Sequence, residues 1–342
     1  MKFIWLTCIL LLSTSLMKGQ TLGGRTAYTF MKLQPSLVAA ASGGTNVSLM
    51  TDEVSIAFQN PALLSDKMHG RLAANFNSLY AGISHFSLYQ AYTHDKLNTH
   101  FGLGLVYLNY GNMIETDPAG NEIGSLRPRD FMVQFSAARQ YLNKWMYGAT
   151  FKVIHSNYGL VRSSAIATDV GIRYCDTARL LQMSLVAMNM GVVLNPYVAG
   201  QSEELPFDVV FGISKKLEKA PVQFSFTAHH LHRLNVLYND PSFNNVVGTP
   251  NSGSGKFSFE NLFSHFIFST QLNIGKYVEV TAGYNYMRRR ELGIFNVPKG
   301  LVGFSLGAGA VFPKFQIRYA LTYMQNTTGY NQLGINLPLA KY

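Results

Sequence analysis

The sequence predicts an all-β fold: a fourteen-stranded antiparallel transmembrane β-barrel of the outer-membrane type, with an amino-terminal plug. Three observations predict it. Apolar and polar residues alternate in many segments, aromatic residues are abundant while charges are few, and the chain begins with an apolar leader. Alternation places successive side chains on opposite faces of a strand. In an outer-membrane barrel one face meets lipid and the other faces a polar lumen.

The composition favours a membrane barrel over a soluble domain. Of the 342 residues, 13% are charged and 13% are aromatic, whereas globular chains carry about 25% charged residues. No apolar run after Met17 reaches the roughly 20 residues of a spanning helix. The net charge is +10. We expect lipid phosphates and surface glycolipid to supply the negative charges that this basic chain meets. We do not expect nucleic acid as a partner of an exported chain.

Residues 1–20 are expected to be a cleaved export signal. Lys2 precedes an apolar core that extends to Leu12, and small and polar residues follow it, as in secretory leaders. Cys8 lies within that core, without the setting of a lipid anchor, so Cys175 is the single cysteine of the exported chain. No intrachain disulfide can form there, and we expect Cys175 to be structural.

Residues 21–69 are expected to fill the barrel as a plug, and residues 70–342 to form its wall. The first segment is rich in Ala, Gly and Ser and is interrupted by Pro35 and Pro61. A flexible leader is the alternative, but too many apolar residues occur for a free tail. They are Val47, Leu49, Val54, Ile56, Phe58, Leu63 and Leu64.

Fourteen alternating segments follow Gly70, and most have the roughly 9–11 residues of a tilted spanning strand. Their connections are alternately short and long, with the long ones at 111–130, 195–206, 233–265 and 288–300. Long loops on one side predict that this side faces the cell exterior. The segments are 71–80, 83–94, 101–110, 131–140, 145–157, 165–174, 180–192, 207–216, 222–232, 266–274, 278–287, 301–312, 315–324 and 333–337.

The two faces of the last strands illustrate the pattern. Residues 315–324 place Phe315 and Ile317 toward lipid, and Gln316 and Arg318 toward the lumen. In the segment 301–312 the lumen face consists of small residues, which let a plug approach the wall. These small residues are Gly303, Ser305, Gly307 and Gly309.

No catalytic constellation is found, so we expect no enzyme activity and no cofactor. Asp169, on the expected lumen face, is predicted to pair with Arg173 or Arg318. His230 and His232 share a strand face and would hold Zn²⁺ with a third ligand. No acidic or cysteine residue follows closely in the sequence, so hydrogen-bonded histidines and no metal are expected.

Two groups of residues are candidates for binding a partner or lipopolysaccharide. Arginines suit phosphates and acidic partners, although a solvated loop is the alternative. Aromatic residues in the segment 233–265 suit a protein partner, although they could instead fold over the barrel mouth. The candidates are Arg127, Arg129, Arg288, Arg289, Arg290, Phe257, Phe259 and Phe263.

Three stretches carry a family resemblance. They are GGRTAYTFMKLQPSLVAAASGGTNVSLMTDEVSIAFQNPALLSDKMHG (23–70), LPFDVVFGISKKLEKAPVQFSFTAHHLHRLNVLYNDP (205–241) and YNYMRRRELG (284–293). Together they resemble the PorQ family of the type IX secretion system of Bacteroidetes. The first, with Asn60, Pro61 and Ala62, also resembles the wider group of FadL-like fourteen-stranded barrels, which includes PorV.

The resemblance implies a function that the residue pattern alone does not. It implies a non-enzymatic outer-membrane scaffold that holds the surface protein PorZ directly, in an attachment complex with PorU and PorV. That complex cleaves a signal from exported cargo and joins the cargo to lipopolysaccharide. The alternative is a FadL-like channel for hydrophobic small molecules, which requires an apolar pocket and a gap or kink in the wall beside the plug.

Overall fold

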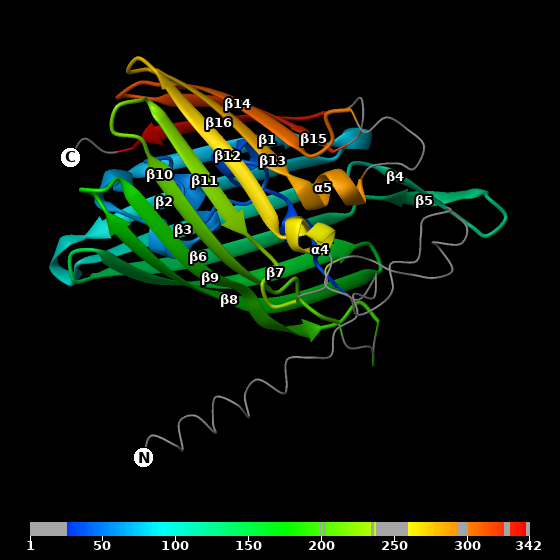
Figure 1. Cartoon of the computed structure of the whole chain (residues 1–342). Helices are drawn as coiled ribbons and strands as arrows, with labels where there is room; N and C mark the ends of the chain where they lie inside the picture. Colours follow the sequence, from blue (N-terminus) through cyan, green and yellow to red (C-terminus); the bar gives the residue numbers. More distant parts are fainter. Residues whose placement is uncertain are drawn as a thin grey trace, which may run out of the picture.

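The computed structural model describes residues 26–198, 200, 203–233, 236, 259–292, 300–324 and 329–339, so the expected signal at 1–20 lies outside the described residues. Fourteen strands form one closed antiparallel barrel (Figure 1). The predicted fold class is therefore confirmed. No helix in the described part of the chain is long and apolar enough to cross a membrane.

The wall follows the order of the sequence, except that a separate hairpin interrupts it after β3. The strands of the wall are β1 (Arg71–Ser78), β2 (Ser84–His94), β3 (Thr99–Asn109), β6 (Arg129–Tyr141), β7 (Trp145–Tyr158), β8 (Val161–Asp176), β9 (Leu181–Asn195), β10 (Asp208–Lys216), β11 (Val222–Ala228), β12 (Phe266–Ile274), β13 (Val278–Asn285), β14 (Phe304–Val311), β15 (Gln316–Tyr323) and β16 (Gly329–Pro338).

The barrel closes between its first and last strands. β1 pairs with β16 in antiparallel register, from Arg71 opposite Pro338 to Ser78 opposite Asn331. Closure leaves the sheet without a free edge strand, which suits a lipid environment. Individual strands differ in length from the predicted segments. β8 is longer than 165–174, while β13 ends earlier than the segment 278–287 because a helix begins at Tyr286.

Alternation decides which side chains face outward. In β15, Ile317 and Tyr319 are 41% and 44% exposed, whereas Gln316 and Arg318 are 2% and 4% exposed. The predicted faces of this strand are thus correct. Around the barrel the exposed face is likewise apolar, which suits contact with lipid chains.

The long connections all lie at one end of the barrel, because they alternate with the short turns in an antiparallel wall. The connection 111–130, predicted as a loop, instead contains the hairpin of β4 (Met113–Thr116) and β5 (Glu122–Leu126). Its turn is held by Asp117, whose carboxylate accepts hydrogen bonds from the backbone of Ala119 and Asn121. Two short helices, α4 (Phe259–Ser264) and α5 (Tyr286–Glu291), lie at this end too, and Figure 1 shows the hairpin projecting beyond it.

Residues 26–69, here called the inner segment, lie inside the barrel. Its α2 packs against the inner faces of β13, β14, β15 and β16. Its η4 packs against β6, β7 and β8, on the opposite side of the lumen. Most of its side chains are buried. Its helical turns are η2 (Thr29–Lys32), α2 (Leu37–Ala41), η3 (Val54–Phe58), η4 (Pro61–Leu63) and η5 (Asp66–Met68); two further turns, η6 (Tyr80–Gly82) and η7 (Asp95–Leu97), lie in the wall's connections.

Candidate functional site

Glycines of the wall let the inner segment approach it closely. A Cβ atom on Gly283 would lie 2.3 Å from the backbone nitrogen of Gly43, and one on Gly307 would lie 2.5 Å from Cβ of Ala41. Neither distance is compatible with a side chain, so these positions seat the turn that follows α2. The prediction that Gly307 faces an approaching segment is confirmed. Gly309, in contrast, makes room for an ion pair of the wall, 2.8 Å from Cγ of Glu279.

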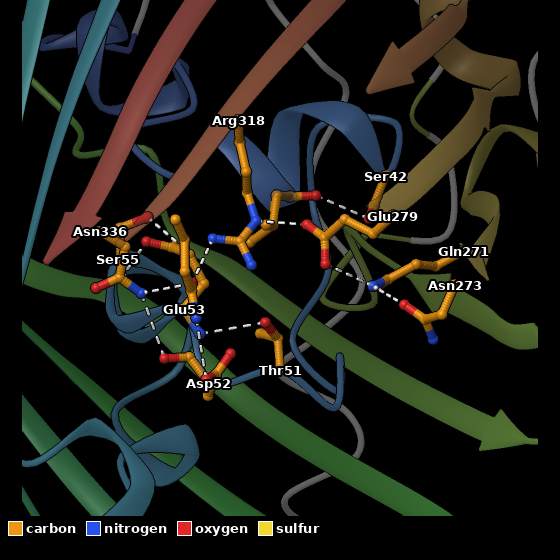
Figure 2. Close-up of polar contacts among 12 residues, drawn as sticks. Ser42, Thr51, Asp52, Glu53, Ser55, Gln271, Asn273, Glu279, Arg318 and Asn336 are labelled. Atoms are coloured by element: carbon orange, nitrogen blue, oxygen red, sulfur yellow. Dashed lines mark hydrogen bonds and ion pairs between the residues drawn. The ribbon is translucent and has the colours of Figure 1, made fainter. Parts of the chain in front are cut away.

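That ion pair begins a polar seam between the wall and the inner segment (Figure 2). Arg318 pairs with Glu279 and also donates to Gln316 Oε1 over 2.7 Å. Gln316 in turn donates to the Asp52 carboxylate over 3.1 Å. Asp52 also pairs with Arg71 at 3.1 Å. The seam therefore joins β13, β15 and β1 to Asp52, two residues before η3.

Glu53, beside this seam, is buried, with 2% of its surface exposed. Its carboxylate caps η3 by accepting from Ser55 N at 3.0 Å and Ser55 Oγ at 2.7 Å. Burial raises the pKa of Glu53 above its usual value, and the nearby Arg318 and the bonds from Ser55 offset this in part. Such a carboxyl inside the molecule can change its protonation when the inner segment moves.

A second buried ion pair lies across the lumen, between Lys152 of β7 and Asp169 of β8. Their charged atoms are 2.6 Å apart, and the two side chains are 4% and 1% exposed. The predicted partners of Asp169 are therefore wrong. Arg318 pairs with Glu279, and Arg173 donates to the backbone of Leu63. Lys152 is the true partner because the β7–β8 register places it two residue pairs along from Asp169, on the same face, which sequence spacing does not reveal.

The Lys152–Asp169 pair also holds an irregular point of β9. Asn189 has a φ of 58°, which is uncommon for a residue other than glycine. Its backbone nitrogen donates to Asp169 Oδ1 over 2.7 Å, and its Oδ1 accepts from Lys152 over 2.8 Å. The register between β8 and β9 shifts here, as in a β-bulge. A bulge is a common way to end strand pairing in a barrel wall.

Pairing between β9 and β10 does end at this bulge. Met188 lies opposite Asp208, the first residue of β10, so β9 continues to Asn195 without a β10 partner. A cavity of about 620 Å³ occupies this gap in the wall. Its apolar lining consists of Met190, Val192, Val193, Pro196, Leu205 and Phe207, and its polar lining includes Asn189, Glu203, Glu204 and Arg233.

The inner segment begins at the rim of this gap. Thr26 forms a parallel bridge with Glu204, and the Ala27 nitrogen donates to the Glu204 carbonyl over 2.9 Å. The ring of Tyr28 packs against that of Tyr197 with 5.6 Å between centroids. The start of the inner segment and the lining of the cavity are thus in direct contact.

The arginines predicted as binding residues do not form one patch. Arg127 and Arg129 are exposed beside the β4–β5 hairpin. Arg288 is 8% exposed, donates to Ser305 Oγ over 3.2 Å, and lies against Gly44 of the inner segment. Burial lowers the pKa of Arg288 to about 10, so it remains charged at neutral pH. Of the other two, Arg289 donates to the carbonyls of Gly300 and Val302, just before β14, and Arg290 pairs with Glu260 at 2.6 Å.

The predicted aromatic residues lie on α4, with one exception. Phe259 and Phe263 are 73% and 45% exposed. The Phe263 ring also contacts Tyr286 of α5, with 6.0 Å between centroids. Phe257 lies outside the described residues. Aromatic side chains therefore are accessible at the long-loop end, beside Arg290.

Sequence reasoning missed the most irregular part of the wall. Asn189 and Gly191 fall inside the predicted strand 180–192, and a polar residue and a glycine there are the signals of a bulge that could have indicated it. It also missed Asp208, which the fold brings to the predicted histidines. The carboxylate of Asp208 accepts a hydrogen bond from the His230 backbone nitrogen over 2.7 Å.

Comparisons with known proteins identify the fold. No protein-family profile matches the chain, and no curated protein sequence does. Among solved structures, the CymD monoaromatic hydrocarbon channel aligns with a TM-score of 0.51 and 14% identity, over 90% of this chain and 97% of that one. The Pseudomonas putida toluene transporter TodX aligns with a TM-score of 0.51 and 12% identity, over 89% and 97%. At these identities the likeness is one of fold, and this chain has the barrel architecture of those two proteins.

Proposed function

We propose that this protein is an outer-membrane channel that admits small hydrophobic molecules through the gap between β9 and β10. The observation that carries the proposal is the cavity of about 620 Å³ at the β9 bulge, in contact with the start of the inner segment. Its size is that of a small-molecule site, and apolar side chains provide much of its lining. It is the pocket and wall gap that the channel alternative requires.

The contents of the rest of the lumen favour entry of the hydrophobic molecule from the side, through the wall gap. The inner segment packs against opposite parts of the wall, and two buried ion pairs lie along its course. A hydrophobic molecule would gain little from a path past such charges. A molecule dissolved in the outer leaflet or at the rim reaches the cavity without passing them. In this proposal the inner segment acts as the plug, and its first residues move when the molecule passes.

Uptake into liposomes tests the channel. Because the fold is shared with channels whose names specify monoaromatic compounds, labelled toluene is the first substrate to try. We expect uptake by the wild-type protein, and a loss of most of it in Val193→Trp, which fills the cavity. The matched control is Ile172→Trp, at a position of β8 that is 48% exposed on the outer face. Equal uptake by both variants would rule out the gap as the route.

We also propose a second function, as an anchor that holds a surface protein of a type IX secretion attachment complex. The specific observation in its favour is the apolar surface at the long-loop end. Ile114 and Ile123 of the β4–β5 hairpin are 64% and 62% exposed, and Phe259 of α4 is 73% exposed. Exposed apolar residues at one end of a barrel suit a protein partner. With the long loops outside the cell, PorZ would bind here directly, with PorU and PorV in the same complex and lipopolysaccharide around the barrel.

Co-purification in mild detergent tests the anchor. Ile114→Asp combined with Ile123→Asp is expected to release PorZ while the barrel stays in the membrane. Leu97→Asp combined with Leu142→Asp is the matched control, because these leucines are 53% and 68% exposed in turns at the opposite end. If PorZ is retained by the hairpin variant, or never co-purifies with the wild type, the anchor proposal fails and the channel proposal is unaffected.

A further inference from the structure

Three side chains with metal-ligating atoms converge at the long-loop end of the wall. Asp208 begins β10, and His229 and His230 follow β11. Nδ1 of His230 lies 2.9 Å from Nδ1 of His229 and 2.9 Å from Oδ2 of Asp208. The three ligand atoms lie within 4.8 Å of one another. Nδ1 of His232 lies near the same carboxylate, 3.5 Å from Oδ1.

Hydrogen atoms alone do not satisfy these contacts. A neutral imidazole nitrogen either donates one hydrogen or accepts one. If Nδ1 of His230 donates to Asp208, the same hydrogen cannot also be aimed at Nδ1 of His229. If it accepts from His229, its lone pair faces the carboxylate. One of the two 2.9 Å contacts is therefore left without a well-directed hydrogen, whereas a cation between the three atoms satisfies all of them.

Two further features single out this cluster. His229 is 5% exposed, and within the described part of the chain its Nδ1 has one hydrogen-bonding contact, with His230. Among the residues that the structure describes, neither its Nε2 nor Nδ1 of His232 has a hydrogen-bond partner. In addition, His230 has a φ of 58°, a conformation that costs energy for a residue with a Cβ atom and that concentrates at functional sites. The turn thus holds the His230 ring toward Asp208 at some cost.

We propose that Asp208, His229 and His230 bind a divalent transition-metal ion, with Zn²⁺ as the best match and His232 as a fourth ligand. Imidazole and carboxylate are usual zinc ligands, at about 2.0–2.2 Å. Ligand atoms around a tetrahedral ion of that radius are about 3.3 Å apart, so the atoms now 2.9 Å apart need shift by only a few tenths of an ångström. Hard cations such as Ca²⁺ prefer all-oxygen sites.

The site would fix the rim of the wall gap. It ties the turn 229–233 to the first residue of β10, where pairing with β9 ends. The ring of Phe207, which lines the cavity, packs against His232 with 5.0 Å between centroids. Arg233 also lines the cavity. A bound ion thus holds one edge of the cavity in place, whether the protein serves as channel or as anchor.

Metal binding to the full exported chain tests the proposal. The protein is prepared without a histidine tag, folded in detergent, stripped with a chelator and titrated with Zn²⁺ by calorimetry. Co²⁺ then replaces Zn²⁺, and its visible absorption spectrum reports the ligand geometry. The variants are Asp208→Asn, which keeps the side-chain shape, and His230→Ala. His155→Ala is the matched control, because His155 is exposed on β7, away from the cluster, and its ring nitrogen Nδ1 bonds to Ser164.

We expect the wild type and His155→Ala to bind one Zn²⁺ per chain, with a tetrahedral Co²⁺ spectrum. Both site variants should bind at least about tenfold more weakly, since even partners of ligands cost about 10–100-fold in affinity. Resistance of the folded barrel to SDS confirms folding of each variant. The proposal is overturned if the folded wild type binds no Zn²⁺ more tightly than His230→Ala, or if Asp208→Asn binds as the wild type does.

Discussion

Removal of one partner of the buried Lys152–Asp169 pair is expected to destabilise the folded protein strongly. Removal of the ammonium leaves a buried carboxylate without a counter-charge, which costs about 3–5 kcal/mol. The same loss removes the hydrogen bond to Asn189 at the β9 bulge. Lys152 therefore contributes both to the free energy of unfolding and to the shape of the gap.

We predict that Lys152→Met lowers the free energy of unfolding by about 3–5 kcal/mol, measured by urea unfolding from lipid vesicles. Lys144→Met is the control. Lys144 pairs with Asp176 at 2.8 Å, but half of its side chain is exposed, and exposed pairs contribute little. Similar unfolding curves for the two variants would contradict a buried pair.

The burial of Glu53 predicts that the seating of the inner segment in the barrel depends on pH. Its usual carboxyl pKa of 4.5 applies when the inner segment is released, and burial raises it when the segment is seated. The seated state therefore binds more protons between these two values. Seating is then favoured below pH 4.5 and weakens as the pH rises through the raised pKa.

Proteolysis of the inner segment, followed between about pH 4 and about pH 8, measures this effect. Protection in the wild type should decline as the pH rises. Glu53→Gln keeps an acceptor for the Ser55 nitrogen without a charge, so its protection should stay nearly constant. A wild-type profile as flat as that of Glu53→Gln would show that Glu53 does not control seating.

The residue pattern predicted some of these contacts and not others. The role of Gly307 could be predicted, because a small residue on the lumen face indicates a close approach of another segment whatever the strand pairing is. The partner of Asp169 could not, since Lys152 reaches it across the pairing of β7 with β8. The same holds for Asp208 and His230, which are 22 residues apart in the sequence. Charge partners between strands depend on register, which alternation leaves open.

Among the elements, β9 shows the limit of periodicity most clearly. Its alternation predicted a strand, but the bulge at Asn189 depends on how the strand pairs with β8 and on the side chain of Asp169. Likewise the connection 111–130 carries a DPAG turn that is typical of a hairpin, yet its length suggested a loop. Turn chemistry was the signal that would have found β4 and β5.

The fit of α2 and its turn to the wall gives a prediction for an element. Gly283→Val should displace the turn, because its Cβ would lie 2.3 Å from the Gly43 backbone. Hydrogen exchange of residues 37–43 should become faster. Gly124→Val in the hairpin is the control, since its nearest neighbour is a flexible carboxylate at 3.4 Å. Unchanged exchange in Gly283→Val would mean that the segment is not seated against β13.

For the whole molecule, the sequence was sufficient to predict the architecture because the requirement is simple. Each strand must present apolar residues to lipid and polar residues inward, and all backbone groups must pair within a closed wall. The gap was not predictable from that requirement, because it is a local exception to it. Its existence depends on the bulge, on the late start of β10 at Asp208, opposite Met188, and on the residues that connect the two strands.

The central claim is that the inner segment begins at the wall gap and controls passage through it. Thr26→Cys with Glu204→Cys, in a Cys175→Ser background, tests this most directly, because the two positions are bridge partners and suit a disulfide. Labelled toluene uptake into liposomes is measured before and after oxidation. We predict that the disulfide forms, that uptake falls, and that reduction restores it. Failure of the disulfide to form in the folded barrel, or uptake that is the same with and without it, would contradict the account.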